Sequence, residues 1–428
     1  MATYVKTLTG DSTARFGFRG TDLGFTAITN HGYCISIFGD TFDAATPDPP
    51  ATGWRSPVGL RQHNADIQNG IVWDNCIGGA RAKEMIPYRH SPAETPGQPI
   101  TEIPNDLIHL PDGRYIMTTF GVRNWANSSA GGSWSTWYSR MWTSTETNAE
   151  NWERTKDLDT GKENMDFRND ANTQWRYFQN NTMIMWPGED WVYIYGTNEG
   201  RWNGGGIHLM RVDWRSMWKP STYQFFGQDR GGKWGWRVNG PVMAILMPSV
   251  SGNGIGEISA QVIDGKVVLS YCDGVLGVVT RTSPRPEGVW ADYRRHIDSD
   301  AAPFLYAPVI HPYSHLDGKA QMLLSQWPHA ETPNGSRSTF YGVKQWQVDL
   351  SPSTVELPKK LAKSVGDLSR QPADLAGYTG PLAPPLSSLE TPDLVAFLSD
   401  HSEDNTMDRA DLTAAIEQSR APKERLTI

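Results

Sequence analysis

The sequence predicts an all-β protein, a five-bladed β-propeller with a C-terminal extended and short-helical extension. Three observations lead to this prediction. Strand-like runs recur from about residue 15 to about residue 350, and long amphipathic helices do not occur among them. Glycine (41) and proline (29) are plentiful, which favours many turns. Aromatic residues reach 11%, with 18 tryptophans, enough to fill a β core and still supply a ligand surface.

Five strand–turn–strand units account for the strand-like runs. In each unit a run rich in β-branched or aromatic residues follows a turn, and a second such run precedes that turn. The predicted hairpins pair 23–29 with 33–40, 105–110 with 113–120, 180–186 with 191–197, 257–262 with 265–273, and 308–314 with 320–327. Degenerate repeats of this size are typical of propeller blades. A β-sandwich or a solenoid is the alternative architecture.

The chain divides into three parts. Residues 1–350 form the predicted propeller, which carries the candidate catalytic residues. Residues 351–390 are rich in proline, serine and leucine without strand periodicity, which indicates a linker. Residues 391–428 contain two short helix patterns and are expected to form a helical segment that docks on a partner or on the same chain.

Charge and cysteine content exclude several functional classes. The net charge of −8 and the lack of Lys/Arg runs argue against nucleic acid as a partner. Cys34, Cys76 and Cys272 are odd in number and widely spaced, so neither disulfides nor a zinc site is expected, and Cys34 is read as a core residue. No metal site and no cofactor are predicted. The N-terminus shows no signal-peptide pattern, and no apolar stretch has the length of a membrane span.

The most informative carboxylates lie in the first hairpin, within residues 19–42. A three-residue turn at 30–32 sets a register that places Asp22 opposite Asp40. Directly opposed residues on antiparallel strands have Cβ atoms ~4.5–5.5 Å apart. Two carboxylates this close repel each other unless one is protonated, and glycosidases use such a pair as an acid and a nucleophile or base.

Three glycines surround this pair. Gly20, Gly24 and Gly39 are expected to keep the backbone beside both acids open to a ligand. The competing interpretation is structural, because aspartate is a common turn and cap residue at strand ends. A register slip of one residue would also place Asp22 and Asp40 on opposite faces.

The motifs G-T-D-L-G (20–24), F-G-D-T-F (38–42) and W-R-S-P (54–57) resemble the endo-D-arabinanase glycoside hydrolases of mycobacteria, related actinobacteria and their phages, formerly a domain of unknown function. The resemblance covers about residues 8–350. It implies a five-bladed propeller that cleaves α-D-arabinofuranosyl linkages of arabinogalactan and lipoarabinomannan. It also implies that Asp22 and Asp40 are the essential acids, without fixing which one is the nucleophile.

Repeat positions suggest further substrate-binding residues around the axial opening. Glu257 is either a third carboxylate in the pocket or a solvated strand end, and His311 is either a ligand residue or a structural histidine. The complete set of candidates is Glu257, Asn105, Asp106, Asn180, Trp54, Arg55, Tyr306 and His311, with Asn181 beside Asn180. The glycine-rich segment 201–209 is interpreted as a flexible loop.

Together these inferences predict a retaining glycoside hydrolase that degrades cell-wall arabinan. The expected location is a phage tail in the virion, in preference to secretion, because the particle would deliver the enzyme to the cell surface. Expected partners are the polysaccharide, tail proteins bound through the C-terminal segment, and a second copy of the chain, with no membrane contact. The alternatives are a non-catalytic carbohydrate- or receptor-binding propeller and a structural minor tail protein.

Overall fold

A computed structural model describes residues 2–48, 51–125, 134–162, 165–201, 205–247, 254–274, 276–297, 305–328 and 339–351. Within these residues the regular structure is β, apart from four short 3₁₀ helices. The predicted helical segment at 391–428 and the predicted linker, except Ser351, lie outside the described residues. No helix in the described ranges is both long and apolar enough to span a membrane.

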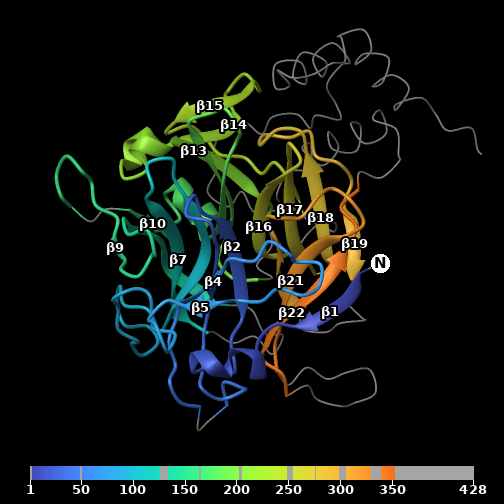
Figure 1. Cartoon of the computed structure of the whole chain (residues 1–428). Helices are drawn as coiled ribbons and strands as arrows, with labels where there is room; N and C mark the ends of the chain where they lie inside the picture. Colours follow the sequence, from blue (N-terminus) through green and yellow to red (C-terminus); the bar gives the residue numbers. More distant parts are fainter. Residues whose placement is uncertain are drawn as a thin grey trace, which may run out of the picture.

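The strands form five separate antiparallel sheets, which are the blades of a β-propeller (Figure 1). The predicted fold class is confirmed. Blade 1 contains β2 (Leu23–Ile28), β3 (Cys34–Phe38), β4 (Val58–Gln62) and β5 (Asn75–Cys76). Blade 2 contains β6 (Glu102–His109), β7 (Tyr115–Asn124), β8 (Ser135–Ser144) and β10 (Asp166–Arg168), with β9 (Glu153–Arg154) paired to β8.

The remaining three blades follow in chain order. Blade 3 contains β11 (Asn180–Met185), β12 (Trp191–Thr197), β13 (His208–Asp213), β14 (Gln224–Gln228) and β15 (Trp234–Val238). Blade 4 contains β16 (Ile255–Ile263), β17 (Lys266–Asp273), β18 (Gly277–Ser283) and β19 (Arg294–Ile297). Blade 5 contains β20 (Leu305–Ile310), β21 (Ala320–Gln326), β22 (Gly342–Val348) and β1 (Thr3–Thr7).

The first strand of each blade belongs to an inner ring around the propeller axis. Contacts run from β2 to β6, then to β11, β16 and β20, and back to β2. Each of these strands pairs with the next strand in the chain, so the five predicted hairpins are the inner halves of the blades. In the fifth hairpin the first strand is Leu305–Ile310 and not 308–314 as predicted. The inner hairpins were visible in the sequence because both their faces are buried, as the fully buried β3 shows.

The ring is closed by hydrogen bonds between the two ends of the propeller. The N-terminal strand β1 pairs antiparallel with β22, from Thr3 opposite Gln347 to Thr7 opposite Lys344. Figure 1 shows β1 in dark blue beside β22 in orange. The last blade therefore contains the first described strand, which pairs with the edge of β22 and is itself the outer strand of this blade.

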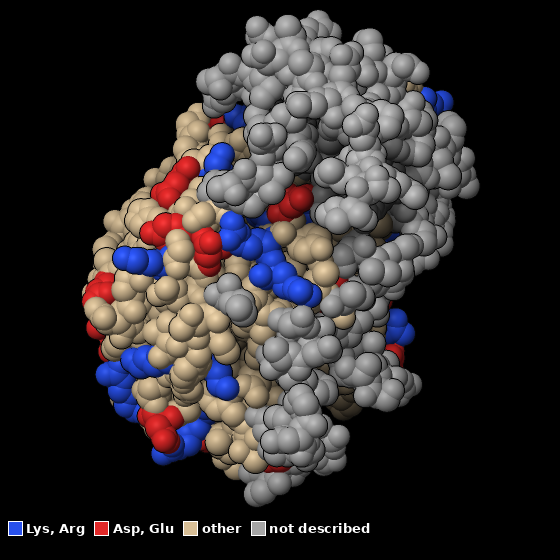
Figure 2. Space-filling model, turned by 90° about the vertical axis from the view of Figure 1, so that its right-hand side faces the viewer, with Lys and Arg blue, Asp and Glu red and all other residues tan. Residues whose placement is uncertain are grey.

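Apolar clusters fill the spaces between neighbouring blades. One cluster joins blade 1 to blades 2 and 5, a second joins blades 3 and 4, a third joins blades 2 and 3, and a fourth joins blades 4 and 5. The three cysteines are buried and unpaired, and Cys34 is a fully buried core residue, as expected. On the face shown in Figure 2, the described Lys/Arg and Asp/Glu side chains are interspersed.

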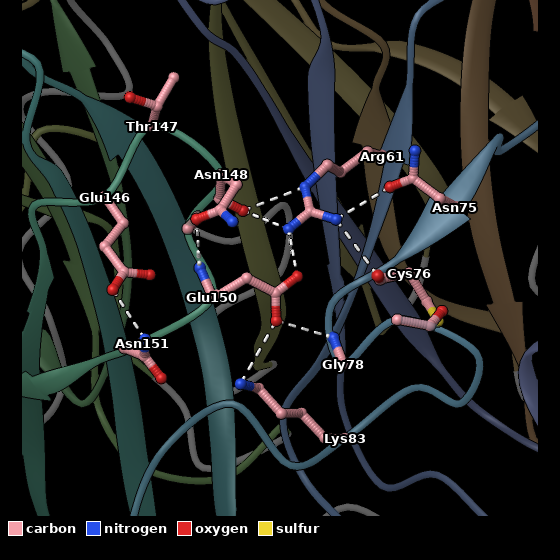
Figure 3. A network of polar contacts seen from close by, with 12 residues as sticks. Arg61, Asn75, Cys76, Gly78, Lys83, Glu146, Thr147, Asn148, Glu150 and Asn151 are labelled. Carbon is pink, nitrogen blue, oxygen red and sulfur yellow. Dashed lines mark hydrogen bonds and ion pairs between the residues drawn. The ribbon is translucent and has the colours of Figure 1, made fainter.

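A polar clamp joins blade 1 to the loop that follows β8 (Figure 3). Arg61 of β4 donates to Asn75 Oδ1 at 2.8 Å within its own blade, and to the carbonyl of Asn148 at 3.0 Å and Glu150 Oε1 at 2.7 Å across the interface. Glu150 Oε2 accepts from the backbone N–H of Gly78 at 2.9 Å. The guanidinium is only slightly exposed, so this clamp replaces hydrogen bonds that water would otherwise make.

Removal of the clamp is expected to destabilise the propeller. Arg61→Ala leaves Glu150 without its arginine partner, and because that carboxylate is partly exposed we expect a loss of about 2–3 kcal/mol in the free energy of unfolding. Urea unfolding followed by circular dichroism measures this loss. Arg215→Ala is the control, because it removes only exposed ion pairs with Asp190 and Asp213. It should leave the urea concentration at the unfolding midpoint unchanged. Equal losses in both variants would contradict the role of the clamp.

Candidate active site

The two predicted catalytic aspartates lie at the same end of the first hairpin, but they do not face each other. The predicted register holds at Phe25, which pairs with Ile37, and it then shifts so that Leu23 pairs with Phe38. Asp22 accordingly accepts a backbone hydrogen bond from Gly39 at 3.1 Å. The expectation that Asp22 is directly opposite Asp40 is therefore wrong by one residue.

A β-bulge on the inner strand causes this shift. Leu23 (φ 68°) and Gly24 (φ 103°) both have left-handed backbone conformations, and Leu23 pays an energetic cost because it has a side chain. Similar register shifts occur near the same ends of β6, β16 and β20. Bulges are frequent next to active sites because they redirect side chains, so four of the five inner strands are irregular where their first residues converge.

The bulge places the carboxyl group of Asp22 over Gly39. A Cβ atom at Gly39 would collide with Asp22 Oδ1, and a Cβ atom at Gly20 would collide with the backbone of Ala44. These two glycines make room for other parts of the chain, which differs from the expectation that they leave space for a ligand. Because Asp40 directly follows Gly39, both acids still belong to one site.

Asp22 is nearly buried and only partly hydrogen-bonded. Its Oδ2 accepts from the hydroxyl of Tyr306 at 2.8 Å, whereas its Oδ1 is buried and has no hydrogen-bond partner. Burial raises the pKa of Asp22 to about 7, the charge of Asp40 adds to this, and the hydroxyls of Tyr306 and Tyr341 oppose it. Asp22 is therefore able to hold a proton near neutral pH.

Asp40 is better supplied with donors. Its Oδ1 accepts from Trp54 Nε1 at 2.7 Å and from Thr101 Oγ1 at 2.8 Å, and its backbone carbonyl accepts from the Tyr341 hydroxyl at 3.2 Å. Burial raises the pKa of Asp40, but the hydrogen bonds from Trp54 and Thr101 favour its ionised form. The two acids thus have different environments.

A histidine supports the Trp54 side of the site. His90 Nδ1 faces the carbonyl of Ile100 at 2.9 Å, and Nε2 faces Glu84 Oε2 at 3.2 Å and the Tyr88 hydroxyl at 3.3 Å. Burial lowers the pKa of His90, but the bonds to Glu84 and Ile100 outweigh it and raise that pKa. The His90 ring packs against the ring of Trp54, with centroids 4.2 Å apart.

Glu257 lies in the bulge of β16 and binds a residue that the sequence analysis missed. Arg201 donates to both of its carboxylate oxygens, at 3.0 and 2.5 Å, and the guanidinium lies 4.2 Å from the ring centre of Tyr306. The charge of Glu257 is a minor contribution to the raised pKa of Asp22. Glu257 is buried, which contradicts its interpretation as a solvated strand end, while its role as a pocket carboxylate stays a prediction. Arg201 is the first residue of segment 201–209. The glycines of that segment predicted only a loop, so nothing in the sequence marked Arg201 as a site residue.

Asn180 supports the segment that carries Arg201. Its Nδ2 donates to the carbonyls of Asn198 at 2.9 Å and Gly200 at 3.0 Å, and its Oδ1 is buried without a partner. Asn105 and Asn181 instead share Ser139 Oγ, at 3.2 and 2.8 Å. The amide groups of the latter two residues join blades 2 and 3.

Asp106 holds inner strands together. Its Oδ2 accepts from Thr182 Oγ1 at 2.6 Å and from the backbone of Met183 at 2.7 Å, and its Oδ1 accepts from the backbone of Leu107 at 2.7 Å. Burial raises its pKa to about 7, and these donors oppose that shift. Asp106 was predicted to bind the substrate. The structure gives it a structural role instead, because both of its oxygens have protein partners.

Two other predicted ligands lie away from the acids. His311 follows the opposite end of β20, is fully buried, and bonds Gln62 at 3.0 Å; burial lowers its pKa to about 3. Of its two interpretations, the structural one agrees with this position. Arg55 is buried and donates to the carbonyls of Ala82 at 2.8 Å and Gly17 at 2.7 Å, so it fixes loops. Trp54 and Tyr306, by contrast, contact the acids directly.

No group of three or more histidine, cysteine, aspartate or glutamate side chains that could hold a metal ion occurs in the described parts of the chain. The site geometry therefore consists of carboxylates, tyrosine hydroxyls, an arginine and a tryptophan.

A known protein family covers nearly all of the described propeller. A family model described as "Domain of unknown function (DUF4185)" matches residues 8–347. The chain belongs to the DUF4185 family. The match begins directly after β1 and ends within β22, so it includes the inner strands of all five blades and both acids.

Solved structures are similar to this DUF4185 protein, and the one with a TM-score above 0.5 shares its fold. A protein from Bacteroides ovatus described as a "putative hydrolase" is 16% identical, with a TM-score of 0.51 over 81% of this chain and 87% of that chain. A family 43 endo-arabinanase from Bacillus licheniformis is 12% identical, with a TM-score of 0.40 over 80% of this chain and 95% of that chain. No curated protein matches the sequence.

The raised pKa of Asp22 makes a prediction about stability. The pKa is about 7 in the folded chain against 3.8 for an ordinary aspartate, so the folded chain holds more protons between these values. Ionisation of Asp22 therefore destabilises the fold as the pH rises from about 4 to about 7. Asp22→Asn removes this ionisation and should stabilise the chain above pH 7 by on the order of 2–4 kcal/mol.

Thermal unfolding at pH 5 and pH 8 measures this effect as a Tm advantage of the variant that grows with pH. Asp213→Asn is the matched control, because hydrogen bonds from Arg215 hold the pKa of Asp213 below its usual value. Its Tm difference from the wild type should stay constant between pH 5 and pH 8. A Tm difference for Asp22→Asn that is also independent of pH would contradict the buried, protonated carboxyl.

Proposed function

We propose that this DUF4185 protein is a glycoside hydrolase that cleaves α-D-arabinofuranosyl linkages in mycobacterial cell-wall arabinan. The supporting observation is the pair Asp22 and Asp40, two carboxyls in one site with unequal hydrogen bonding. Glycosidases place two acids in different environments, which separates their pKa values. One acid then serves as the proton donor and the other as the nucleophile or base. The choice of substrate rests on the resemblance of the motifs at 20–24, 38–42 and 54–57.

In this proposal Asp22 is the general acid. It is the more deeply buried of the two, its pKa is raised to about 7, and its Oδ1 has no protein partner. The proton of the protonated Asp22 would pass to the oxygen of the leaving sugar as the glycosidic bond breaks. Because the acid must be protonated, activity should fall as the pH rises through about 7.

Asp40 is the ionised partner and the nucleophile. Trp54 and Thr101 donate to the same oxygen, Oδ1, which leaves Oδ2 to attack the anomeric carbon. The covalent intermediate is then hydrolysed by water, which gives its proton back to Asp22, and the configuration is retained. The charge of Asp40 is the second cause of the raised pKa of Asp22, so the two carboxyls are electrostatically coupled, and retention is the stereochemistry we propose for the pair.

Digestion of purified mycobacterial arabinogalactan tests the proposal. The wild-type chain should release arabinose oligosaccharides, and Asp22→Asn and Asp40→Asn should each lower the rate by about 10³-fold or more, because loss of a tuned acid or nucleophile removes several kcal/mol of transition-state stabilisation. NMR of the first products should show the retained α-anomer. Asp106→Asn is the matched control, because this buried acid also has a raised pKa but lies between strands.

Two results would contradict the proposal. If the wild type binds the polymer but releases no products, the protein is a carbohydrate-binding propeller. Release of the β-anomer would replace retention by inversion and would make Asp40 a general base.

The second part of the proposal is delivery of the enzyme by a phage tail. A substrate in the cell wall requires action outside the host cytoplasm, and a virion supplies that position. Immunogold labelling of particles with an antibody against residues 391–428 should mark the tail. Absence of the chain from purified particles would contradict this location and leave the hydrolase proposal unaffected.

A further inference from the structure

Exposed tryptophans in the described ranges are few and share a location. Trp54, Trp125 and Trp327 are 37%, 48% and 42% exposed, while every other described tryptophan is buried or half-buried. Burying a large aromatic side chain is favourable, so exposed tryptophans in one region call for an explanation.

All three lie at the end of the propeller that carries the catalytic acids. Trp54 precedes β4 and donates to Asp40. Trp125 directly follows β7, which ends beside the start of β6. Trp327 directly follows β21, whose last residue pairs with Leu305 at the start of β20. By contrast, the exposed Ile28 lies at the far end of β2, and the exposed Tyr4 lies on the outer strand β1.

Aromatic contacts connect Trp54 to Trp327 past the acids. The ring of Trp54 stacks on Phe42 with centroids 6.1 Å apart, Phe42 contacts Tyr341 at 6.2 Å, and Tyr341 contacts Trp327 edge-on at 5.4 Å. The Tyr341 hydroxyl donates to the carbonyl of Asp40. Two buried rings, Phe42 and Tyr341, therefore connect the two exposed rings, and Tyr341 also contacts Asp40.

Trp125 is connected to the other acid by a separate chain of contacts. Its ring meets Trp134 edge-on at 6.4 Å, and Trp134 lies 5.1 Å from the guanidinium of Arg201. Arg201 covers Tyr306, which donates to Asp22. Each acid thus has at least one exposed tryptophan connected to it through packed side chains.

We infer that Trp54, Trp125 and Trp327 form a stacking rim that binds sugar rings of one polysaccharide chain beside the acids. Tryptophan suits this role because its flat face packs against the C–H face of a sugar and its N–H reaches a hydroxyl. This inference rests on the proposed function for its ligand class.

Affinity electrophoresis tests the rim separately from catalysis. The full chain with Asp22→Asn, which is expected not to cut, is run through gels that contain soluble mycobacterial arabinogalactan or, as a comparison, dextran. Arabinogalactan should retard it, and adding Trp125→Ala or Trp327→Ala should weaken retardation about fivefold or more each. Tyr4→Ala, which removes an exposed aromatic side chain elsewhere, should change nothing.

Two further variants sharpen the test. Trp327→Phe keeps a ring that can stack on a sugar and should lose less affinity than Trp327→Ala. With Asp22 restored, Trp125→Ala and Trp327→Ala should raise KM more for the polymer than for short oligosaccharides, because only the polymer reaches all three rings. Trp54 is left unchanged here because its N–H also serves Asp40.

The outcomes separate the two proposals. Equal retardation of the parent and the tryptophan variants overturns the rim, whatever the hydrolysis assay shows. Arabinogalactan gels that fail to retard even the parent also overturn it. Retardation that depends on the tryptophans, together with no product release by the wild type, keeps the rim and overturns the hydrolase.

Discussion

The closed ring of five inner strands is the constraint on which the site depends. Each blade begins with its inner strand, and polar contacts join neighbouring inner strands, such as the bond from Thr182 to Asp106 and that from Tyr306 to Asp22. The first residues of these strands therefore meet at one end of the axis. Glu257 reaches the same end on β16 although it is far from Asp22 in the sequence. The ring thus gathers ionisable groups that no local motif contains.

Much of this arrangement can be predicted from the sequence, and the exceptions have physical causes. The five hairpins were predictable because apolar runs and turn residues are local signals. The bulge at Leu23–Gly24 was not predictable. Both faces of this hairpin are buried, so its side chains show no alternation that an inserted residue would disturb. Arg201 and Trp327 were missed for a different reason. Their roles depend on contacts between blades, and each looks ordinary within its own segment.

Two buried acids with raised pKa values differ in their hydrogen bonding. Asp22 and Asp106 both have pKa values raised to about 7, chiefly by burial. Asp106 uses both of its oxygens for donors from β6 and β11, whereas Asp22 has one oxygen without a hydrogen-bond partner. A raised pKa therefore indicates burial, and hydrogen bonding is the property that distinguishes the proposed catalytic acid from the structural one.

Pairing of β1 with β22 has a consequence for how the protein is made. Of the described strands β1 is synthesised first, and it has no partner until nearly the whole propeller has been synthesised, since Thr7 pairs with Lys344. Contacts this distant in the chain form slowly, and until then β22 presents an open edge. The nascent chain must therefore keep β1 available and β22 protected, which makes the last blade the step at which folding is most exposed to aggregation and to chaperones.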